Sequence, residues 1–152
     1  MRFNTLMYNT GVYTSPVFIV DRTMADVINK RAKGAWGVSD ANRIEYRISE
    51  LSAMLTHLGL DELSTTCKYY WVVSDYFLYE DITRIRNNIK NQQSLLSSYI
   101  PQLTILFSKY PVPDDINVLE QALSNMEVCV EEVAHQQDKF SGTLVSGGGV
   151  LI

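Results

Sequence analysis

The most regular hydrophobic pattern in the chain lies in residues 39–58. Its apolar residues step alternately by four and three, which places them on one face of a helix: Ile44, Ile48, Leu51, Leu55 and Leu58. Ser39 or Asp40 is predicted to cap the first turn, and Gly59 offers a stop. The polar residues opposite are expected to meet water: Arg43, Arg47, Glu50 and Thr56. This amphipathic helix therefore needs apolar partners.

Two further stretches supply partners of the same design. A second helix is predicted around 80–99 and is ended by Pro101. Its apolar face, which Gln92 interrupts, is formed by Ile82, Ile85, Ile89, Leu96 and Tyr99. A third is predicted over about 115–137, capped by Asp114 or Asp115, with a face formed by Ile116, Leu119, Leu123, Met126, Val130 and Val133. Its outer face carries Glu120, Glu127, Glu131 and Glu132. Three such faces bury themselves best against each other.

The three predicted helices also share a short sequence pattern. Starting from Asp40, Asp81 and Asp115, each reads D-x-[NT]-x-[IL]-x-x-x-[IL]. An internal repeat explains this pattern, but so does the local chemistry of any capped amphipathic helix. Both explanations stay open from the sequence alone.

The segments between these helices have their own signals. Thr23 and Asp26 have capping-box spacing and open a short helix through about Arg31. Residues 67–73 form a compact aromatic and β-branched run, expected to be either a strand or an extended plug. Residues 103–107, LTILF, are apolar enough to lie on the helices.

Together these elements predict a mainly α protein. We expect a small three-helix bundle with a short extra N-terminal helix and extended or β-like terminal arms. The predicted divisions are an arm over 1–20, the bundle over 21–142 and a C-terminal extended arm over 143–152, where Gly142 and the glycines at 147–149 argue against helix. The predicted core is Ile44, Ile48, Leu51, Leu55, Ile82, Ile85, Ile89, Leu96, Leu119, Leu123, Met126 and Val130.

The two terminal arms hold strand-prone apolar pieces that such a bundle has no room to bury. They either fray or lie across a neighbouring subunit, adding backbone pairing there. We predict a subunit interface that includes aromatic residues and the C-terminal arm: Phe18, Trp36, Tyr70, Trp71, Leu144, Val150, Leu151 and Ile152.

Length and composition fit a single domain with a sizeable core. The chain has 152 residues, of which 46% are hydrophobic. It holds no run of 18 apolar residues and no signal-peptide order at its start, so neither a membrane partner nor secretion is expected. Cys67 and Cys129 lie far apart without a CxxC spacing, which favours two buried thiols over a disulfide or metal pair.

The net charge of −4 is unevenly distributed. Residues 1–50 carry seven Lys and Arg against five Asp and Glu, whereas residues 101–152 carry two against seven. No basic stripe interleaved with aromatics occurs, which argues against a nucleic-acid partner. The asymmetry is compatible with copies that meet basic end to acidic end, or with scattered solvated charge.

Candidate catalytic or ligand-binding patterns are incomplete. His57 and His135 have no HxxxH spacing, and the Glu132–His135 pair lacks the second Glu-x-x-His and the two further glutamates of a di-iron site. The sequence SGGGV lacks the Lys-Ser/Thr of a phosphate-binding loop, and no GxSxG occurs. We therefore predict no enzyme activity, no metal, no cofactor and no small-molecule substrate.

The order of several weak motifs carries a family resemblance. VDRTMADV followed by KGAWGVSDANRIEYRISELSAML resembles a module of minor structural proteins associated with the tail or baseplate of phages and prophages of Gram-positive bacteria. The second half resembles a companion module, with Trp71, the Asp75-Tyr76-Phe77 turn, the helix start at 84–89, the prolines at 111 and 113, Asn117 and the exit Phe140-Ser141-Gly142. The resemblance spans about residues 16–142.

That resemblance implies a structural role in a phage tail, baseplate or related injection particle. The implied location is the virion, with the host cytoplasm during assembly, and the implied partners are other virion structural proteins and copies of itself. A cytoplasmic helical adaptor that binds a regulatory protein is the alternative. The two differ in stoichiometry, because a virion part occurs in several symmetric copies.

Overall fold

A computed structural model describes residues 18–34, 36–60 and 65–146 of the chain. These residues form four α-helices and one short 3₁₀ helix, and the described part contains no strand. The elements are α1 (Met24–Ile28), η1 (Ala32–Gly34), α2 (Val38–His57), α3 (Tyr79–Leu95) and α4 (Pro113–Ser146). The predicted mainly α class is confirmed.

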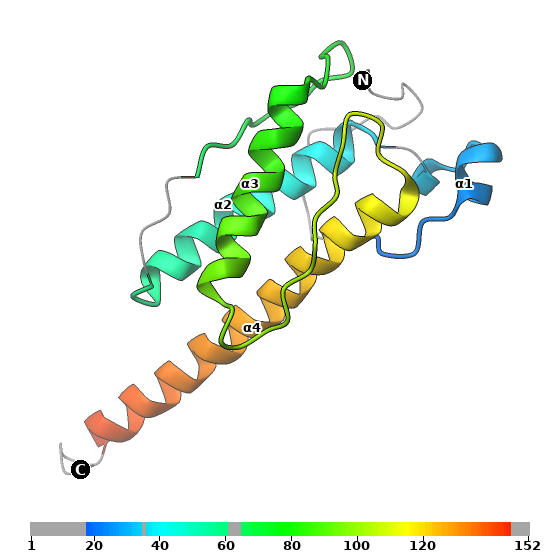
Figure 1. The fold of residues 1–152 in the computed structure, drawn as a ribbon. Coiled ribbons are helices and arrows are strands. Elements are labelled where there is room, and N and C mark those ends of the chain that lie inside the picture. The colour runs from blue at the N-terminus through cyan, green and yellow to red at the C-terminus, as the bar shows by residue number, and fades with distance from the viewer. Residues whose placement is uncertain (1–17, 35, 61–64, 147–152) are drawn as a thin grey trace.

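The helices α2, α3 and α4 pack side by side and run in the same direction (Figure 1). Arg43 and then Arg47 of α2 meet Glu120 and then Glu127 of α4, so position along both helices increases together. Parallel neighbours need connections that return the chain to its starting end. The described parts of these connections, 65–78 and 96–112, are largely extended and lie over the helices.

Each α-helix starts with an aspartate that accepts a hydrogen bond from the backbone three residues earlier. This bond satisfies an amide that has no partner inside the helix. The predicted capping box of α1 is confirmed by its two bonds, which join Thr23 and Asp26 in both directions. The four backbone bonds run from Thr23 N to Asp26 (2.9 Å), Gly37 N to Asp40 (3.0 Å), Leu78 N to Asp81 (2.9 Å) and Val112 N to Asp115 (3.5 Å).

This geometry corrects the predicted start of two helices. Asp40 lies inside α2 and reaches back to Gly37, which is the N-cap, so neither Ser39 nor Asp40 caps the helix itself. Helix α4 begins earlier than predicted, at Pro113, where the missing amide of proline removes one donor that would lack a partner. Asp40 and Asp115 do form hydrogen bonds at the helix starts, as predicted, but they lie inside the first turn and not at the N-cap.

The end of α2 agrees with its prediction, whereas the ends of α3 and α4 differ from theirs. Gly59 has a φ of +79° just after α2, as expected of a glycine stop. Helix α3 ends at Leu95, and Tyr99 is exposed beyond it, so placing Tyr99 on the buried face was wrong. Helix α4 continues through Gly142 to Ser146, which corrects the extended arm predicted from Thr143. One interior glycine costs about 1 kcal/mol and does not forbid a helix.

All twelve predicted core residues are buried. The extended connections complete this core, because Trp71 from the first and Phe107 from the second are also buried. Three rings cluster beside the helix starts, with centroid distances of 5.4 Å for Trp36–Phe77, 5.0 Å for Trp36–Phe107 and 5.9 Å for Phe77–Phe107. Residues 67–73 are thus an extended plug, not a strand, and the LTILF segment lies on the core as predicted.

Helix α1 and η1 form a small lobe beside the helical core (Figure 1). Gly34 lies so close to α1 that an added Cβ would stand 2.4 Å from the carbonyl carbon of Asp26. A side chain there would force the two short helices apart. The lobe connects the extended segment Phe18–Arg22 to the start of α2.

Candidate interaction surfaces and the buried sites that position them

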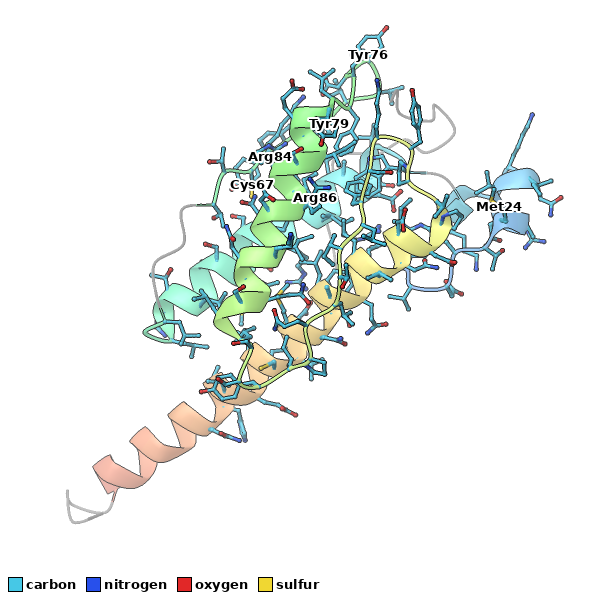
Figure 2. The ribbon with its side chains drawn as sticks, viewed as in Figure 1. Met24, Cys67, Tyr76, Tyr79, Arg84 and Arg86 are labelled. Atoms are coloured by element: carbon cyan, nitrogen blue, oxygen red, sulfur yellow. The ribbon has the colours of Figure 1, made fainter. Side chains whose placement is uncertain are left out.

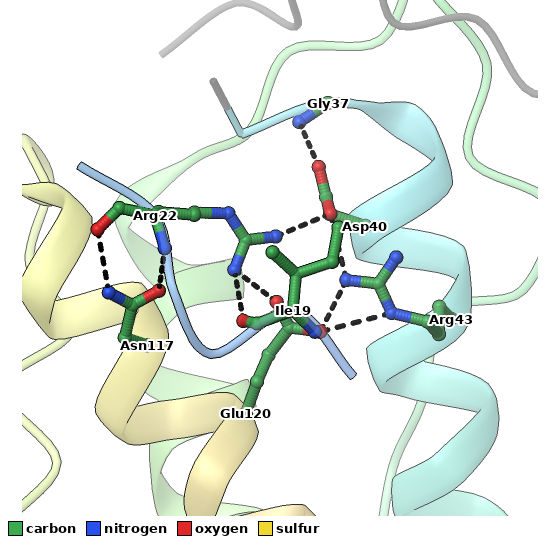
Figure 3. A network of polar contacts seen from close by, with 7 residues as sticks. All are labelled: Ile19, Arg22, Gly37, Asp40, Arg43, Asn117 and Glu120. Atoms are coloured by element: carbon green, nitrogen blue, oxygen red, sulfur yellow. Dashed lines mark hydrogen bonds and ion pairs between the residues drawn. The ribbon is translucent and has the colours of Figure 1, made fainter. Parts of the chain in front are cut away.

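A buried polar site fixes the segment Phe18–Arg22, called the strap below, to α2 and α4 (Figure 3). Asn117 of α4 grips the backbone of Arg22: the Arg22 amide donates to Oδ1 and the Asn117 Nδ2 donates to the Arg22 carbonyl, both at 2.9 Å. Glu120, one turn later, accepts from the Ile19 amide at 3.3 Å and from the Arg22 guanidinium. We call this arrangement the strap site.

The charges within the strap site balance. The Arg22 guanidinium also donates to Asp40 at 2.7 Å, while Arg43 donates to Glu120 at 3.0 Å and to Asp40 at 2.8 Å. The side chains of Arg22, Asp40 and Glu120 are fully shielded from solvent. Two positive and two negative groups therefore form a neutral cluster, as burial of ions requires.

Burial and pairing act in opposite directions on the groups of this cluster. Burial raises the pKa of Glu120, and the attraction of Arg43 and Arg22 offsets part of that rise. Burial alone would lower the pKa of Arg43, but Glu120 and Asp40 outweigh it and raise that pKa above its ordinary value. The prediction that Arg43 and Glu120 face water is therefore wrong.

A second buried site fixes residues Cys67–Val73, called the plug below, to α2. Asn42 grips the Trp71 backbone: the Trp71 amide donates to Oδ1 at 2.8 Å, and Nδ2 donates to the Trp71 carbonyl at 3.1 Å. Glu45 accepts from the Trp71 indole at 2.5 Å and from the Lys68 amide at 3.2 Å. Arg84 of α3 supplies the opposing charge to Glu45. We call this arrangement the plug site.

The strap site and the plug site share one plan. In each, an asparagine and a glutamate three residues apart on a helix bind two residues of an extended segment that are also three apart. The asparagine pairs with one residue's backbone, and the glutamate accepts from that residue's side chain. The sequence pattern common to α2 and α4 is thus D-x-N-x-[IL]-E, beginning at Asp40 and Asp115.

Helix α3 lacks this plan, although it shares the aspartate. Thr83 replaces the asparagine, and its hydroxyl is buried with no hydrogen-bond partner in the described part of the chain. Arg86 replaces the glutamate and donates to the Phe107 carbonyl at 3.4 Å. Gln93, further along α3, instead grips the Leu103 backbone with two bonds of 2.9 Å. In α3, the shared sequence pattern is explained by capping at Asp81. In α2 and α4, the pattern also includes the asparagine and the glutamate that bind an extended segment.

The predicted interface residues divide between the core and the surface. Trp36 and Trp71 are buried in the core, so predicting that they face a neighbouring subunit was wrong. Phe18 is half-buried against the core, and Tyr70 is exposed. Leu144 belongs to α4. Val150, Leu151 and Ile152 lie outside the described residues.

Large apolar side chains are exposed along the segment that leads into α3 and at the first residue of that helix; Figure 2 labels Tyr76 and Tyr79 among them. We call this group the aromatic surface; it consists of Tyr69, Tyr70, Val72, Tyr76, Leu78 and Tyr79. Tyr70 is 88% exposed and has a φ of +65°, a left-handed conformation that is costly for a bulky residue. The flanking plug site holds this backbone in place, because Trp71 is anchored immediately after it.

The candidate ligand-binding residues do not assemble into a metal site. No group of three or more possible ligands occurs among the described residues, and Glu132 and His135 are both exposed. The cysteines are free; Cys129 is buried and Cys67 half-buried, where burial raises the pKa of its thiol to about 11. None of the described helices combines the length and apolarity needed to cross a membrane.

Comparison of the chain with known protein families, with curated proteins and with solved structures finds no match. The resemblance to phage tail and baseplate proteins therefore stays a prediction from sequence motifs.

Proposed function

We propose that this protein is a non-enzymatic structural subunit of a phage tail or baseplate, or of a related injection particle. Its helical core is, in this proposal, a small three-helix bundle that acts as a rigid body, with arms outside it that contact neighbouring subunits. The sequence resemblance supports the class of particle. The aromatic surface is the observation that supports subunit packing as the mode of action.

The aromatic surface has the chemistry of a protein-binding face. Clustered exposed apolar side chains mark contact sites on protein surfaces, and tyrosine is enriched where such contacts contribute most to binding. Tyr69, Tyr70, Tyr76 and Tyr79 each offer a large ring with a polar tip at small entropic cost. The left-handed backbone at Tyr70 adds to this argument, since such strain persists where the surrounding structure enforces it.

The core is built to present that surface rigidly. The plug site ties Trp71 to α2 through three hydrogen bonds, and the Trp71 ring packs on Phe77 with a centroid distance of 5.4 Å. The aromatic residues lie before, between and after these two anchors. A preorganised face loses less entropy on binding than a mobile one.

The experiment is quantitative mass spectrometry of purified particles from cells that supply wild-type or variant chain. We expect wild-type chain in several copies per particle, and a strong loss of incorporation for the double variant Tyr70→Ser/Tyr79→Ser. Tyr99→Ser is the matched control, because Tyr99 is equally an exposed tyrosine but follows the far end of α3. Absence of wild-type chain from intact particles would reject the proposal and favour the cytoplasmic adaptor.

A further inference from the structure

A pocket lies where the chain leaves α3 and crosses α4 (Figure 1). One side is formed by Ile100 and Pro101, and the other by residues of α4 between Asn125 and Gln136. Its volume is about 440 Å³, at the small end of the range of about 300–1,000 Å³ in which proteins hold ligands. We call it the α4 pocket. It follows the end of α3, whereas the aromatic surface lies at the start of that helix.

The walls of the α4 pocket are largely apolar. Cys129 is buried, Ile100 and Val133 are half-buried, and Val128 at the opening is 55% exposed. Walls of this kind cover the methylene groups of a long side chain while its polar end stays in contact with polar groups. The pocket therefore suits an aliphatic chain that carries a polar or charged end.

The charge of the α4 pocket is negative. Among the described residues that line it, Glu132 alone is charged, and none of the ion pairs of the described chain includes this residue. Burial raises the pKa of the Cys129 thiol, and the charge of Glu132 raises it further. The Glu132 carboxylate therefore lies close to the pocket wall that Cys129 forms. A ligand that fits this charge has to supply a cation.

The polar groups of the pocket favour a guanidinium over an ammonium group. The side-chain amides of Asn125 and Gln136 also line the pocket, and each offers an oxygen that accepts hydrogen bonds. The amide of Asn125 accepts one bond from Gln121 and retains a second lone pair. A guanidinium presents several donors in a planar fork, pairs bidentately with a carboxylate and is weakly hydrated, whereas an ammonium group is strongly hydrated.

We propose that the α4 pocket binds an arginine side chain that a partner protein presents. The methylene groups of the arginine lie between Ile100 and Val133, and its guanidinium pairs with Glu132. Free arginine fits less well, because its own carboxylate would lie near Glu131 and Glu132. The pocket has no cation to pair with that carboxylate. A peptide group replaces the carboxylate in a protein segment, so charge complementarity favours a protein as the source of the arginine.

This inference goes beyond the proposed function. It concerns a different surface, and it holds equally for a particle subunit and for an adaptor. Arginine is one of the residues that contribute most to binding at protein interfaces. The aromatic surface supplies contact area, whereas the α4 pocket would select a partner by one charged side chain.

NMR titration of the isotope-labelled full chain tests the chemistry of the ligand. The probes are N-acetyl-arginine methylamide and N-acetyl-citrulline methylamide, which have nearly the same shape but differ in charge. We expect saturable shifts of the Cys129, Glu132 and Val133 amides with the arginine probe, with a dissociation constant of about 1–10 mM. Equal binding of the citrulline probe would overturn the recognition of charge. Tighter binding of free arginine than of the blocked probe would overturn the assignment to a partner protein.

The same titration on variants tests the site. Glu132→Gln should weaken binding of the arginine probe about 3- to 5-fold, the loss expected for an ion pair open to solvent. Glu131→Gln is the matched control, because it removes the same charge from the next exposed residue, which does not line the pocket. It should bind as wild type does. Equal affinities of the two variants would overturn the pairing with Glu132.

Tyr99→Ser gives a second control. Tyr99 borders the pocket, but its side chain is 62% exposed, and the substitution keeps both Glu132 and the apolar walls. Binding should therefore stay within about 2-fold of wild type, as for other contacts at the rim of an interface. Equal thermal melting of all variants by circular dichroism shows that the core is intact. A larger loss for Tyr99→Ser than for Glu132→Gln would overturn the dominant role of the carboxylate.

Discussion

The strap site and the plug site solve the same problem with different chemistry. Both hold an extended segment against a helix through an asparagine and a glutamate, and in both the backbone recognition is the same. They differ in the side chain that is recognised. The strap site buries the charged Arg22 and the plug site buries the neutral indole of Trp71.

This difference changes how much charge each site removes from water. The strap site encloses four charges, and three of their side chains have no exposure at all. The plug site encloses only Glu45, whose partner Arg84 keeps 20% of its side chain exposed. Breaking a closed cluster leaves charges that water cannot reach, whereas a partly exposed guanidinium is rehydrated readily. Disrupting the strap site should therefore cost more unfolding free energy than disrupting the plug site.

The comparison also explains why the helices run parallel. The strap leads into α2, whose Arg43 returns to the Glu120 that binds the strap. The plug leads into α3, whose Arg84 returns to the Glu45 that binds the plug. One carboxylate thus ties an extended segment and the start of the following helix to the same neighbour. Two such ties place the starts of α2, α3 and α4 at one end.

The largest expected effect comes from Glu120→Gln. The substitution keeps the shape of the side chain but leaves Arg22 and Arg43 with Asp40 as their only negative charge, so we expect a loss of about 3–5 kcal/mol in unfolding free energy. Urea denaturation measures it. The control is Glu132→Gln on the exposed face of α4, which should change stability by less than about 0.5 kcal/mol. A loss at Glu120 as small as that of the control would mean that the buried cluster does not hold the strap.

Glu45→Gln should be clearly milder. An amide still accepts one of the hydrogen bonds from Trp71 and Lys68, and the partly exposed Arg84 turns toward solvent, so we expect a loss of about 1–3 kcal/mol. The same urea titration compares the two variants directly. If Glu45→Gln proves as costly as Glu120→Gln, the difference in buried charge does not decide the strength of the two sites.

The two asparagines should behave alike, because both recognise backbone. Asn42→Ala and Asn117→Ala each remove two hydrogen bonds, one to a backbone amide and one to a backbone carbonyl, for about 1–2 kcal/mol apiece. Amide exchange identifies which segment loosens: Trp71 in the first variant and Arg22 in the second. Loss of protection at the other segment would show that the two sites are not independent.

The smallest effect is expected from acid, at the start of α1 beside the strap. Burial of Asp26 would raise its pKa, but hydrogen bonds from the Thr23 side chain and backbone and from Arg31 outweigh this and lower it to about 2. Because the pKa of Asp26 is lower in the folded chain than the ordinary value of 3.8, its carboxylate stabilises the fold at any pH above 3.8. This contribution is lost as the pH falls through about 2.

Carboxyl chemical shifts of Asp26 measured by NMR from about pH 5 to about pH 1.5 follow this titration. In Asp26→Asn, the acid-induced loosening of the α1 amides should disappear. Titration of Asp26 near its ordinary value would contradict the capping geometry.

The apolar part of the fold was predictable because helical periodicity encodes it locally. Ile44, Leu123 and the other ten core residues follow directly from the three-four spacing, and so does the class of the fold. The polar part was not, because the same periodicity assigns Arg43 and Glu120 to the solvent side. Glu120 bonds to the strap, 98 to 101 residues away in the chain, and Arg43 bonds to Glu120, 77 residues away.

The sequence pattern was equally limited in predicting which aromatic side chains lie on the surface. Tyr70, predicted at a subunit interface, is exposed, but Trp36 and Trp71, predicted there too, occupy the core. Trp71 does so because the connection that returns from the end of α2 to the start of α3 packs its ring on Phe77, and Trp36 does so because the segment just before α2 packs its ring on Phe77 as well. Only the direction of the helices settles this, and amphipathic patterns carry no direction. The D-x-N-x-[IL]-E pattern in α2 and α4 was the one signal for the buried sites. The pattern does not itself show which extended segments Asn42 and Asn117 bind, and the structure supplies these partners.

Amide hydrogen exchange by NMR tests the equivalence of the two sites most directly. Both segments lack helix and strand, yet the Ile19 and Arg22 amides donate to α4, and the Lys68 and Trp71 amides donate to α2. We predict slow exchange at these four amides, three residues apart in each segment, with fast exchange at Val20 and Tyr70 between them. Uniformly fast exchange across either segment would contradict the account.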